Sequence, residues 1–281
     1  MLGSRRNDSR DPSVHEPDHL SAEHSLWQIE HNHMTLRLNG IGFRYTRSTT
    51  VFDGFDLTVS SPSTVLLGPN GAGKSTLMGI AATHLTAERG TVSWRDKTPA
   101  GKRGTVAYVR AVAWLPQEIV AVPGLTVREQ VAYMGWLKGM SRSAAWDSSR
   151  QALERVRLTE LADRRSHQLS GGQKRRMGLA GALTHQSELI LMDEPTAGLD
   201  PTQRKNFRGL LDTLRGDVHI VVSTHQTEDL ADSYAEVVVL DRGTVRFQGA
   251  TGDFHALAGD TAGGPRERAE AAYAHLVRGE V

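Results

Sequence analysis

The sequence predicts an α/β fold whose central sheet is parallel or mixed and is covered by helices on both faces. Short, unbroken apolar segments are typical of buried strands, and here they alternate with segments of helical periodicity. One apolar segment, 64–68, also leads directly into a glycine-rich turn and then a helical pattern. The expected buried strands are 64–68, VAYV (106–109), 189–193, 219–224 and 237–241.

Composition places the chain among globular proteins. Of its 281 residues, 38% are hydrophobic and 23% are charged, a balance that supports a packed core. The formal net charge is +1, which argues against bulk electrostatic binding to nucleic acid. The sequence contains no cysteine, so disulfides, thiolate metal sites and catalytic thiols are excluded.

Two further features concern location. No apolar run approaches the roughly 18 residues of a membrane span. An arginine pair stands near the start of the chain but no apolar stretch follows it, so neither a secretory nor a twin-arginine signal is predicted. We therefore expect a cytoplasmic protein.

Residues 1–33 differ from the rest of the chain and are expected to form a disordered extension. They are rich in acidic residues and histidine and poor in large apolar side chains. His15 and His19 have the spacing of neighbours on a helix, but Pro17 lies between them and breaks that geometry. Metal binding by this histidine-rich segment is therefore a minor alternative.

Strand and helix patterns follow this extension. Residues 34–45 and 55–59 alternate apolar and polar side chains, as half-buried strands do. The middle of the chain, about 126–184, has helical periodicity, and Thr126 with Glu129 forms a capping-box pattern at its start. The next helix is expected to carry Ala145, Ser149, Ala152, Leu153 and Val156 on one face.

A glycine-rich loop carries the first chemical signal. Its sequence GPNGAGKS fits the pattern G-x-x-x-x-G-K-[ST] and lies between a predicted strand and a predicted helix. In such a loop backbone N–H groups surround phosphates, and the helix start adds a favourable dipole. Lys74 is then expected to contact the β- and γ-phosphates, and the Ser75 hydroxyl to bind Mg²⁺. The predicted nucleotide-binding residues are Gly68, Pro69, Asn70, Gly71, Ala72, Gly73, Lys74, Ser75 and Thr76.

The apolar strand 189–193 ends in two acidic residues, Asp193 and Glu194. Carboxylates at the end of a buried strand require a cation or a proton. Asp193 is suited to hold Mg²⁺, and Glu194 is suited to orient or deprotonate an attacking water. A surface acid pair is the alternative, which the presence of the phosphate loop disfavours.

A third motif makes a family resemblance specific. Leu169-Ser170-Gly171-Gly172-Gln173 precedes a helical run and resembles the signature of ATP-binding-cassette (ABC) ATPases. The physical interpretation agrees, because a serine and two glycines at a helix start form a site for anions. In that family the signature acts in trans, on the nucleotide held by a second cassette.

Four further positions match the family's motifs by resemblance. Gln117 resembles the Q-loop glutamine, Asp200 the D-loop aspartate at a dimer interface, and His225 the switch histidine that contacts the γ-phosphate. Tyr45 resembles the aromatic residue that stacks on adenine, and Phe43 is a near alternative to it. The segment 60–64 departs from the family's usual Gly-Glu turn, so we expect a local change of turn there.

The resemblance implies a fold and a domain organisation. The fold is a P-loop NTPase core with a mixed or parallel sheet, an antiparallel β subdomain and an inserted helical subdomain. The ATPase domain would cover 34–255, with the helical subdomain at about 120–184. A short helical tail at 256–281 would follow, and its apolar face would pack on the core or meet a partner.

The resemblance also implies an activity, with ATP and Mg²⁺ as its ligands. It assigns hydrolysis to Glu194, His225, Gln117 and Lys74, and Mg²⁺ binding to Ser75, Gln117 and Asp193. Because the chain carries one copy of each motif, it must dimerise head to tail with a second ABC ATPase chain. ATP binding would favour the closed dimer, and hydrolysis would release it.

The branch of the family follows from weaker signals. A transporter motor needs a separate membrane permease, and the segment 125–140 resembles cassettes of bacterial ABC-2-type exporters. The chain would then lie on the cytoplasmic face of the membrane through that permease. Tyr133 and Trp136 are candidates either for the permease contact or for ordinary packing. A soluble ABC ATPase that acts on ribosomes or DNA is the alternative, although no nucleic-acid partner is expected.

Overall fold

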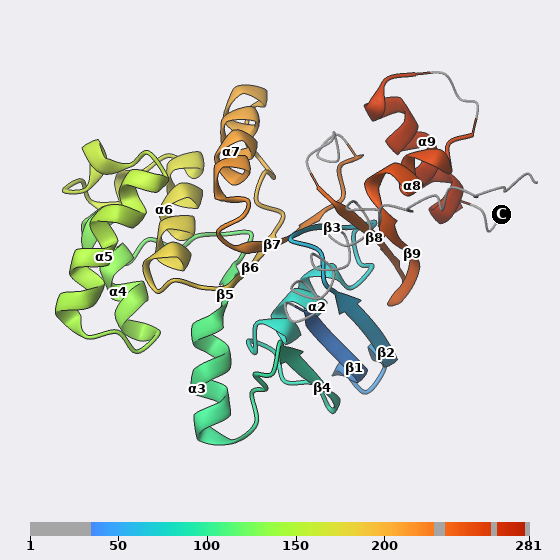
Figure 1. Cartoon of the computed structure of the whole chain (residues 1–281), viewed down its shortest axis with the longest axis horizontal. Helices are drawn as coiled ribbons and strands as arrows, with labels where there is room; N and C mark the ends of the chain where they lie inside the picture. The colour runs from blue at the N-terminus through green and yellow to red at the C-terminus, as the bar shows by residue number, and fades with distance from the viewer. Residues whose placement is uncertain (1–34, 228–233, 260–262, 279–281) are drawn as a thin grey trace, which may run out of the picture.

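The computed structural model describes residues 35–227, 234–259 and 263–278. The expected disordered extension and its His15 and His19 lie outside these residues. In the described part of the chain, two sheets occupy the centre and one side of the molecule, and a group of helices stands on the other side (Figure 1).

A mixed six-stranded sheet forms the centre, in the order β5-β6-β7-β3-β8-β9. The first five strands in this order are parallel, and the last pairs antiparallel with its neighbour. This arrangement confirms the predicted α/β fold class. The strands are β5 (Val112–Leu115), β6 (Leu189–Asp193), β7 (His219–Thr224), β3 (Ser63–Leu67), β8 (Glu236–Asp241) and β9 (Thr244–Ala250).

A separate antiparallel sheet has the order β2-β1-β4. It consists of β1 (Leu36–Thr46), β2 (Thr49–Val59) and β4 (Arg89–Trp94). The apolar side chains of this sheet pack with helix α2 (Lys74–Ala81) and with one face of the central sheet. The alternating pattern read from 34–45 and 55–59 therefore corresponds to real strands with one buried face.

Three helices stand together beyond the edge of the central sheet at β5 (Figure 1). They are α4 (Val127–Leu137), α5 (Arg142–Arg155) and α6 (Gly171–Thr184), with short 3₁₀ turns at η1 (Thr159–Leu161) and η2 (Ser166–Gln168). The predicted capping box is present, since the Thr126 side chain accepts from the Glu129 N–H and the Glu129 side chain accepts from the Thr126 N–H. The predicted apolar face of α5 is buried, and Val156 follows the helix directly.

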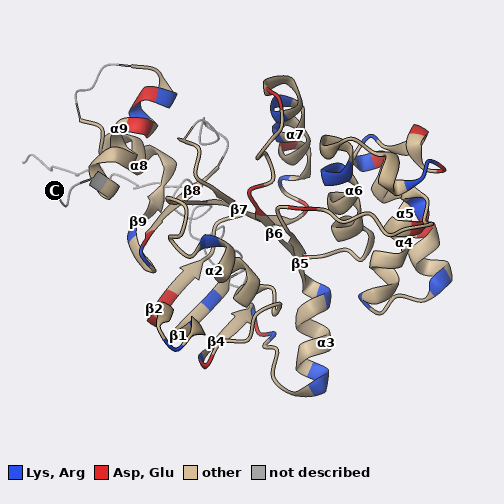
Figure 2. Ribbon diagram, turned by 180° about the vertical axis from the view of Figure 1, so that it is seen from behind, with Lys and Arg blue, Asp and Glu red and all other residues tan. Residues whose placement is uncertain are grey.

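The strand predicted at 106–109 is wrong, because these residues belong to helix α3 (Gly101–Ala111). The strand next to β6 is β5, which begins directly after that helix. In the helix, Tyr108 is fully buried and its hydroxyl donates to the carbonyl oxygen of Ala81 at 2.6 Å. Tertiary packing of this tyrosine outweighs the strand preference of the two valines beside it. Lys and Arg residues lie at both ends of α3 (Figure 2).

The remaining helices are α7 (Pro201–Leu214), which precedes β7, and α8 (Thr251–Ala256) and α9 (Pro265–Arg278), which follow β9 on the side of the molecule away from the helical group (Figure 1). Ala269 and Ala272 are buried, and Tyr273 and Leu276 pack against the same core. The apolar face predicted for the tail therefore packs on the core of its own chain.

Alternate residues of the central strands enter two different cores. Val65 and Leu67 of β3 face the core built with α4 to α9, whereas Leu66 faces the core shared with α2 and the antiparallel sheet. The period of two along a strand is what separates these sets. Helices within the described ranges do not combine the length and apolarity needed to cross a membrane.

Candidate functional site

The predicted phosphate loop connects the end of β3 with the start of α2. Gly71 and Gly73 have φ values of +83° and +106°, which glycine adopts without strain. Gly73 is also the N-cap of α2, so the loop passes directly into the helix start. A Cβ atom on Gly68 would lie 2.1 Å from the carbonyl oxygen of Leu240 in β8. The glycines therefore set the path of the loop and allow it to pack tightly against the neighbouring strand.

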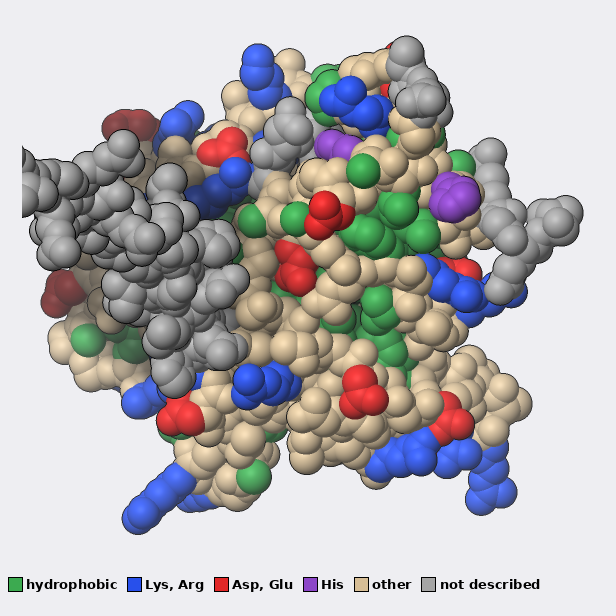
Figure 3. Space-filling model, turned by 45° about the vertical axis from the view of Figure 1, so that its right-hand side comes forward, with side chains coloured by type: hydrophobic (Ala, Val, Ile, Leu, Met, Phe, Trp, Pro, Cys, Tyr) green, Lys and Arg blue, Asp and Glu red, His purple; other side chains and the backbone are tan. Residues whose placement is uncertain are grey.

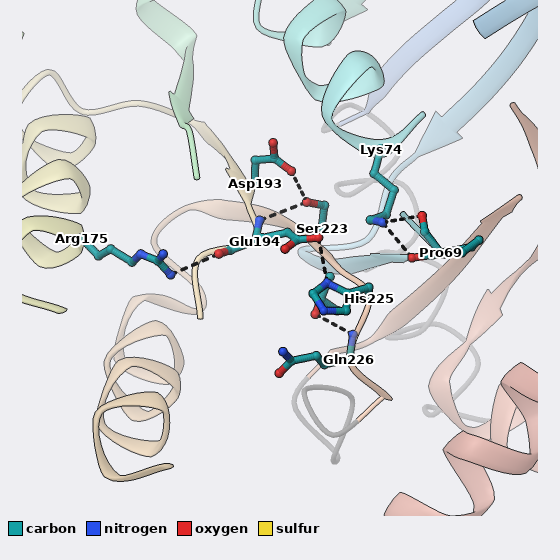
Figure 4. A network of polar contacts seen from close by, with 10 residues as sticks. Pro69, Lys74, Arg175, Asp193, Glu194, Ser223, His225 and Gln226 are labelled. Carbon is teal, nitrogen blue, oxygen red and sulfur yellow. Dashed lines mark hydrogen bonds and ion pairs between the residues drawn. The ribbon is translucent and has the colours of Figure 1, made fainter. Parts of the chain in front are cut away.

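Lys74 lies inside this loop, with an exposed fraction of 5%. Its Nζ donates to the carbonyl oxygens of Gly68 at 2.7 Å and Pro69 at 3.0 Å (Figure 4). Burial lowers the pKa of Lys74, and the charges of Glu194 and Asp193 act in the opposite direction. The Lys74 ammonium group is therefore close enough to the Asp193 and Glu194 carboxylates to be stabilised by their charge.

The two acids at the end of β6 are linked through Ser223, which lies in the neighbouring strand β7. Its Oγ donates to Oδ1 of Asp193 at 2.5 Å, and the same Oγ accepts from the N–H of Glu194 at 3.1 Å. Asp193 is 5% exposed, so its carboxylate is held in place largely out of water. A single hydroxyl thus fixes the positions of both acids relative to each other (Figure 4).

Glu194 also contacts His225, which follows β7. The Nδ1 atom of His225 lies 2.9 Å from Oε1 of Glu194. Glu194 has a φ of +45°, a conformation that residues with side chains rarely adopt. The turn after it is closed by a hydrogen bond from the N–H of Ala197 to the Glu194 carbonyl oxygen at 3.1 Å. The structure therefore brings the predicted base and the predicted switch histidine into direct contact.

Gln117 lies in the loop after β5 and is exposed. Its carbonyl oxygen accepts from Nη2 of Arg175 at 3.4 Å, and Nη1 of the same arginine donates to the Glu194 carbonyl oxygen at 3.2 Å. Arg175 belongs to α6 and lies two residues after the end of the predicted signature 169–173. The Gln117 loop and the acidic strand end are thus tied to one side chain.

The adenine-stacking candidate lies beside the phosphate loop. Tyr45 is 58% exposed, and its hydroxyl lies 3.1 Å from the Thr76 hydroxyl in α2. Phe43 is 7% exposed and packs edge-on against Tyr45 with 5.0 Å between ring centroids. An exposed ring face is needed for stacking, so the geometry favours Tyr45 over Phe43 for this role.

The signature segment is at a separate place, at the start of α6 rather than of α2 (Figure 1). Ser170 and Gln173 form a capping box, in which the Ser170 Oγ accepts from the Gln173 N–H at 3.3 Å and Gln173 Oε1 accepts from the Ser170 N–H at 2.9 Å. Asp200 caps α7 in a similar way, accepting from the Gln203 N–H at 2.8 Å. A cavity of about 380 Å³ is lined by Ser170, Gly172 and Gln173 of the signature and by residues of α7 that include Gln203.

The sequence interpretation assigned no role to two residues of this site, Ser223 and Arg175. A serine at the end of an apolar strand and an arginine after a glycine-rich helix start are weak local signals. Their contacts reach residues far along the chain, to Asp193 and to Gln117. Only the packed fold reveals them.

The residues present fit a magnesium ion with a bound triphosphate. Asp193 offers a buried carboxylate at the edge where the phosphate loop lies, and hydroxyl and amide oxygens are the remaining predicted ligands, from Ser75 and Gln117. Oxygen donors of this kind are those that Mg²⁺ prefers. Across the described ranges, no cluster of three or more His, Cys, Asp or Glu residues suggests a different metal site.

Comparison with known proteins gives consistent matches. The family model described as ABC transporter matches residues 52–197. The chain is 36% identical over 202 residues to the energy-coupling factor transporter ATP-binding protein EcfA of Methanocaldococcus jannaschii, a match that covers 70% of this chain and 71% of that protein. It is 33% identical over 226 residues to the sulfate/thiosulfate import ATP-binding protein CysA of Synechococcus elongatus, covering 76% of this chain.

The match covers 64% of the length of that CysA protein, so the chain corresponds to less than two thirds of it. Among solved structures, cbiO1 from Clostridium perfringens, part of the ABC transporter complex cbiONQ, matches with a TM-score of 0.66 and 25% identity. That match covers 76% of this chain and 88% of the other.

Proposed function

The chain belongs to the ABC transporter family, and from that membership we propose that it is the ATP-hydrolysing subunit of a transporter. The observation that carries the proposal is the convergence of Lys74, Asp193, Glu194 and His225 at one edge of the central sheet (Figure 4). This edge is formed by the carboxyl ends of the parallel strands, where open α/β sheets bind their ligands.

Hydrolysis needs positioning and charge neutralisation more than covalent chemistry. The N–H groups of the loop hold the phosphates, and Lys74 exchanges its two carbonyl partners for β- and γ-phosphate oxygens. Glu194 accepts a proton from the attacking water, Gln117 helps to place that water, and His225 donates to the γ-phosphate. The His225–Glu194 contact supports this assignment, because it directs the carboxylate.

Three oxygen donors are proposed to hold Mg²⁺: the Ser75 hydroxyl, the Gln117 amide and the Asp193 carboxylate. When bound, the ion supplies positive charge to the β- and γ-phosphate oxygens. Ser223 keeps the Asp193 carboxylate at a fixed angle through its 2.5 Å hydrogen bond.

We further propose a head-to-tail dimer with a second ABC ATPase chain. The phosphate loop starts α2, whereas the signature 169–173 starts α6 in the separate group of helices (Figure 1). Because each chain carries one copy of both motifs, a nucleotide between the two motifs requires two chains. ATP binding would shift the population toward the closed dimer.

The permease is expected to contact helix α4. Tyr133, Trp136 and Leu137 are exposed there, and the Tyr133 and Trp136 rings stack with 5.8 Å between centroids. Trp and Tyr are enriched at protein interfaces. The segment 125–140 that contains them also resembles ABC-2-type exporter cassettes, which supports export as the direction and attachment to the cytoplasmic face of a membrane as the location.

A soluble ABC ATPase that acts on ribosomes or DNA is the second candidate. Charge disfavours it, since the net charge is +1 and Figure 3 shows Lys and Arg side chains interspersed with Asp and Glu on the face in view. Binding to nucleic acid is normally supported by a basic surface.

A trapped variant tests the proposal. Tagged Glu194→Gln protein is produced in its own cells, given Mg·ATP and purified after the membranes are solubilised, with Lys74→Ala as the matched control that should not bind nucleotide. A stoichiometric membrane protein recovered with Glu194→Gln and reduced with Lys74→Ala supports a transporter subunit. Ribosomal proteins or nucleic acid, with nothing from the membrane, would overturn it. Transport assays on vesicles that contain the recovered complex then decide between export and import.

A further inference from the structure

The guanidinium group of Arg175 joins three segments of the chain. Nη1 donates to the carbonyl oxygen of Glu194 at 3.2 Å and also to that of Pro195, and Nη2 donates to the carbonyl oxygen of Gln117 at 3.4 Å. Figure 4 shows this side chain extending from the helical group toward the acids at the end of β6. One planar cation therefore connects α6, the turn after β6 and the loop after β5.

This arrangement has an electrostatic cost that a freely solvated arginine avoids. Burial lowers the pKa of Arg175, and the nearby charge of Glu194 partly compensates. Arginine presents several N–H donors in a fixed plane, so it can bridge carbonyl groups in a defined geometry. A lysine ammonium keeps the charge but lacks that rigid fork.

The contacts hold an unusual stretch of backbone. Glu194 has a φ of +45°, and such a conformation persists only where surrounding contacts enforce it. On one side, the Glu194 N–H donates to the Ser223 carbonyl oxygen and Oγ, both at 3.1 Å. On the other side, Arg175 holds the carbonyl oxygens of Glu194 and Pro195. The direction of the Glu194 carboxylate toward His225 depends on both.

We propose that Arg175 is a positioning residue for ATP hydrolysis, which fixes the Glu194 peptide and the Gln117 loop relative to α6. Its hydrogen bonds within the described ranges go to Glu194, Pro195 and Gln117 and not to the phosphate loop, so it acts on the placement of the attacking water rather than on nucleotide binding. The inference rests on the proposed ATPase function. The proposal adds a mechanical link: when the helical group moves, the Arg175 side chain displaces Glu194 and the Gln117 loop with it.

Three variants test it: Arg175→Gln, Arg175→Lys and the control Arg176→Gln. Arg176 is the next residue of the same helix and is also partly buried, but its Nη1 donates to the carbonyl oxygens of Val156 and Arg157 at the end of α5. For Arg175→Gln we expect kcat to fall between about 10- and 100-fold, as misplacement of reacting groups does, with the KM for ATP within about twofold of the wild type. The kcat of Arg175→Lys should lie between those of Arg175→Gln and the wild type. Arg176→Gln should keep the wild-type kcat.

Thermal unfolding of each variant identifies a loss of fold, and if Arg175→Gln does not fold then Arg175→Lys carries the test. A double variant with Gln117→Ala adds a second readout. A shared positioning role predicts that the combined loss in kcat is smaller than the product of the single losses. A purely structural role predicts multiplicative losses.

The proposal is overturned if Arg175→Gln leaves kcat unchanged, raises the KM instead, or matches the loss of Arg176→Gln. These outcomes are distinct from failure of the proposed function, in which the wild-type chain itself shows no ATP hydrolysis.

Discussion

The Nδ1 atom of His225 lies 2.9 Å from the Oε1 atom of Glu194, so the residues that directly follow the adjacent strands β6 and β7 are direct partners. The Glu194 side chain is 14% exposed and that of His225 is 37% exposed. The carboxylate is thus largely buried, while the imidazole that it contacts is more exposed. To act as a general base, the Glu194 carboxylate needs its negative charge as well as its shape.

We therefore expect Glu194→Gln to retain nucleotide binding and to lose hydrolysis. The amide can still hydrogen-bond to His225 but cannot accept a proton from water. The loss in kcat should be about 100-fold or more, the range of general base catalysis. Phosphate release measures turnover, and size-exclusion chromatography with ATP should show an accumulated dimer. Turnover close to that of the wild type would remove Glu194 from the role of base.

The nucleotide base is predicted to stack on Tyr45. Tyr45→Ala should raise the KM for ATP between about 5- and 150-fold, because base stacking on an aromatic ring contributes about 1–3 kcal/mol. The kcat should change little, since Tyr45 lies apart from the acids. Tyr45→Phe is the control, because it keeps the ring and removes only the contact with Thr76. Equal KM values for the Ala and Phe variants would argue against stacking.

The exposed rings on α4 are predicted to hold the membrane partner. Trp136 is 44% exposed, and Trp136→Ala should reduce the amount of membrane protein recovered with the Glu194→Gln trap by about tenfold, as loss of an aromatic interface anchor does. Val106→Ala, at an exposed apolar residue on α3, provides a matched surface control. Full recovery with Trp136→Ala would show that the partner binds elsewhere.

Stability is predicted to fall in mild acid because of His185. Burial, with a contribution from the charge of Lys138, lowers the pKa of His185 to about 4. Its Nδ1 donates to the Gly181 carbonyl oxygen at 3.1 Å, and its Nε2 is buried without a hydrogen-bond partner among the described residues. Arg110 and Lys138 line the same cavity, so no anionic group of the lining favours the charged form.

The sign follows from proton binding. In the unfolded chain a histidine takes up its proton near pH 6.5, whereas the folded chain resists it until about pH 4. The free energy of unfolding should therefore decrease as the pH falls from 6.5 to 4, by at most about 3 kcal/mol. Denaturant unfolding at pH 7 and pH 4.5 measures this change in the free energy of unfolding. In His185→Gln the free energy of unfolding should decrease less between the two pH values. Parallel curves for the two proteins would contradict this cause.

Much of the fold was predictable because its signals are local. The glycine loop, the capping box at Thr126 and the apolar strands each lie within a few residues of sequence. The prediction at 106–109 was wrong for a complementary reason. The hydroxyl of Tyr108 finds its acceptor at Ala81, and that distant contact selects a helix in a segment whose composition favours a strand.

The residues of the candidate site also differ in whether their signals are local in the sequence. Lys74, Asp193 and Glu194 belong to local motifs, whereas Ser223 and Arg175 acquire their contacts only from the packing of separate segments. A serine that links the Asp193 carboxylate to the Glu194 backbone and an arginine that bridges three carbonyl groups leave no periodic or compositional trace. Residues of this kind are found from the fold.

The capping box at Ser170 affects how substitutions in the signature should be interpreted. The hydroxyl of this serine is already engaged by the backbone of its own helix, so Ser170→Ala removes about 1 kcal/mol of local helix stability as well as any contact made across a dimer. A loss of dimer formation in that variant would therefore combine two causes, a less stable helix and a missing contact across the dimer. Ser170→Thr keeps a capping hydroxyl and adds a methyl group, so it separates damage to the helix from damage to the interface.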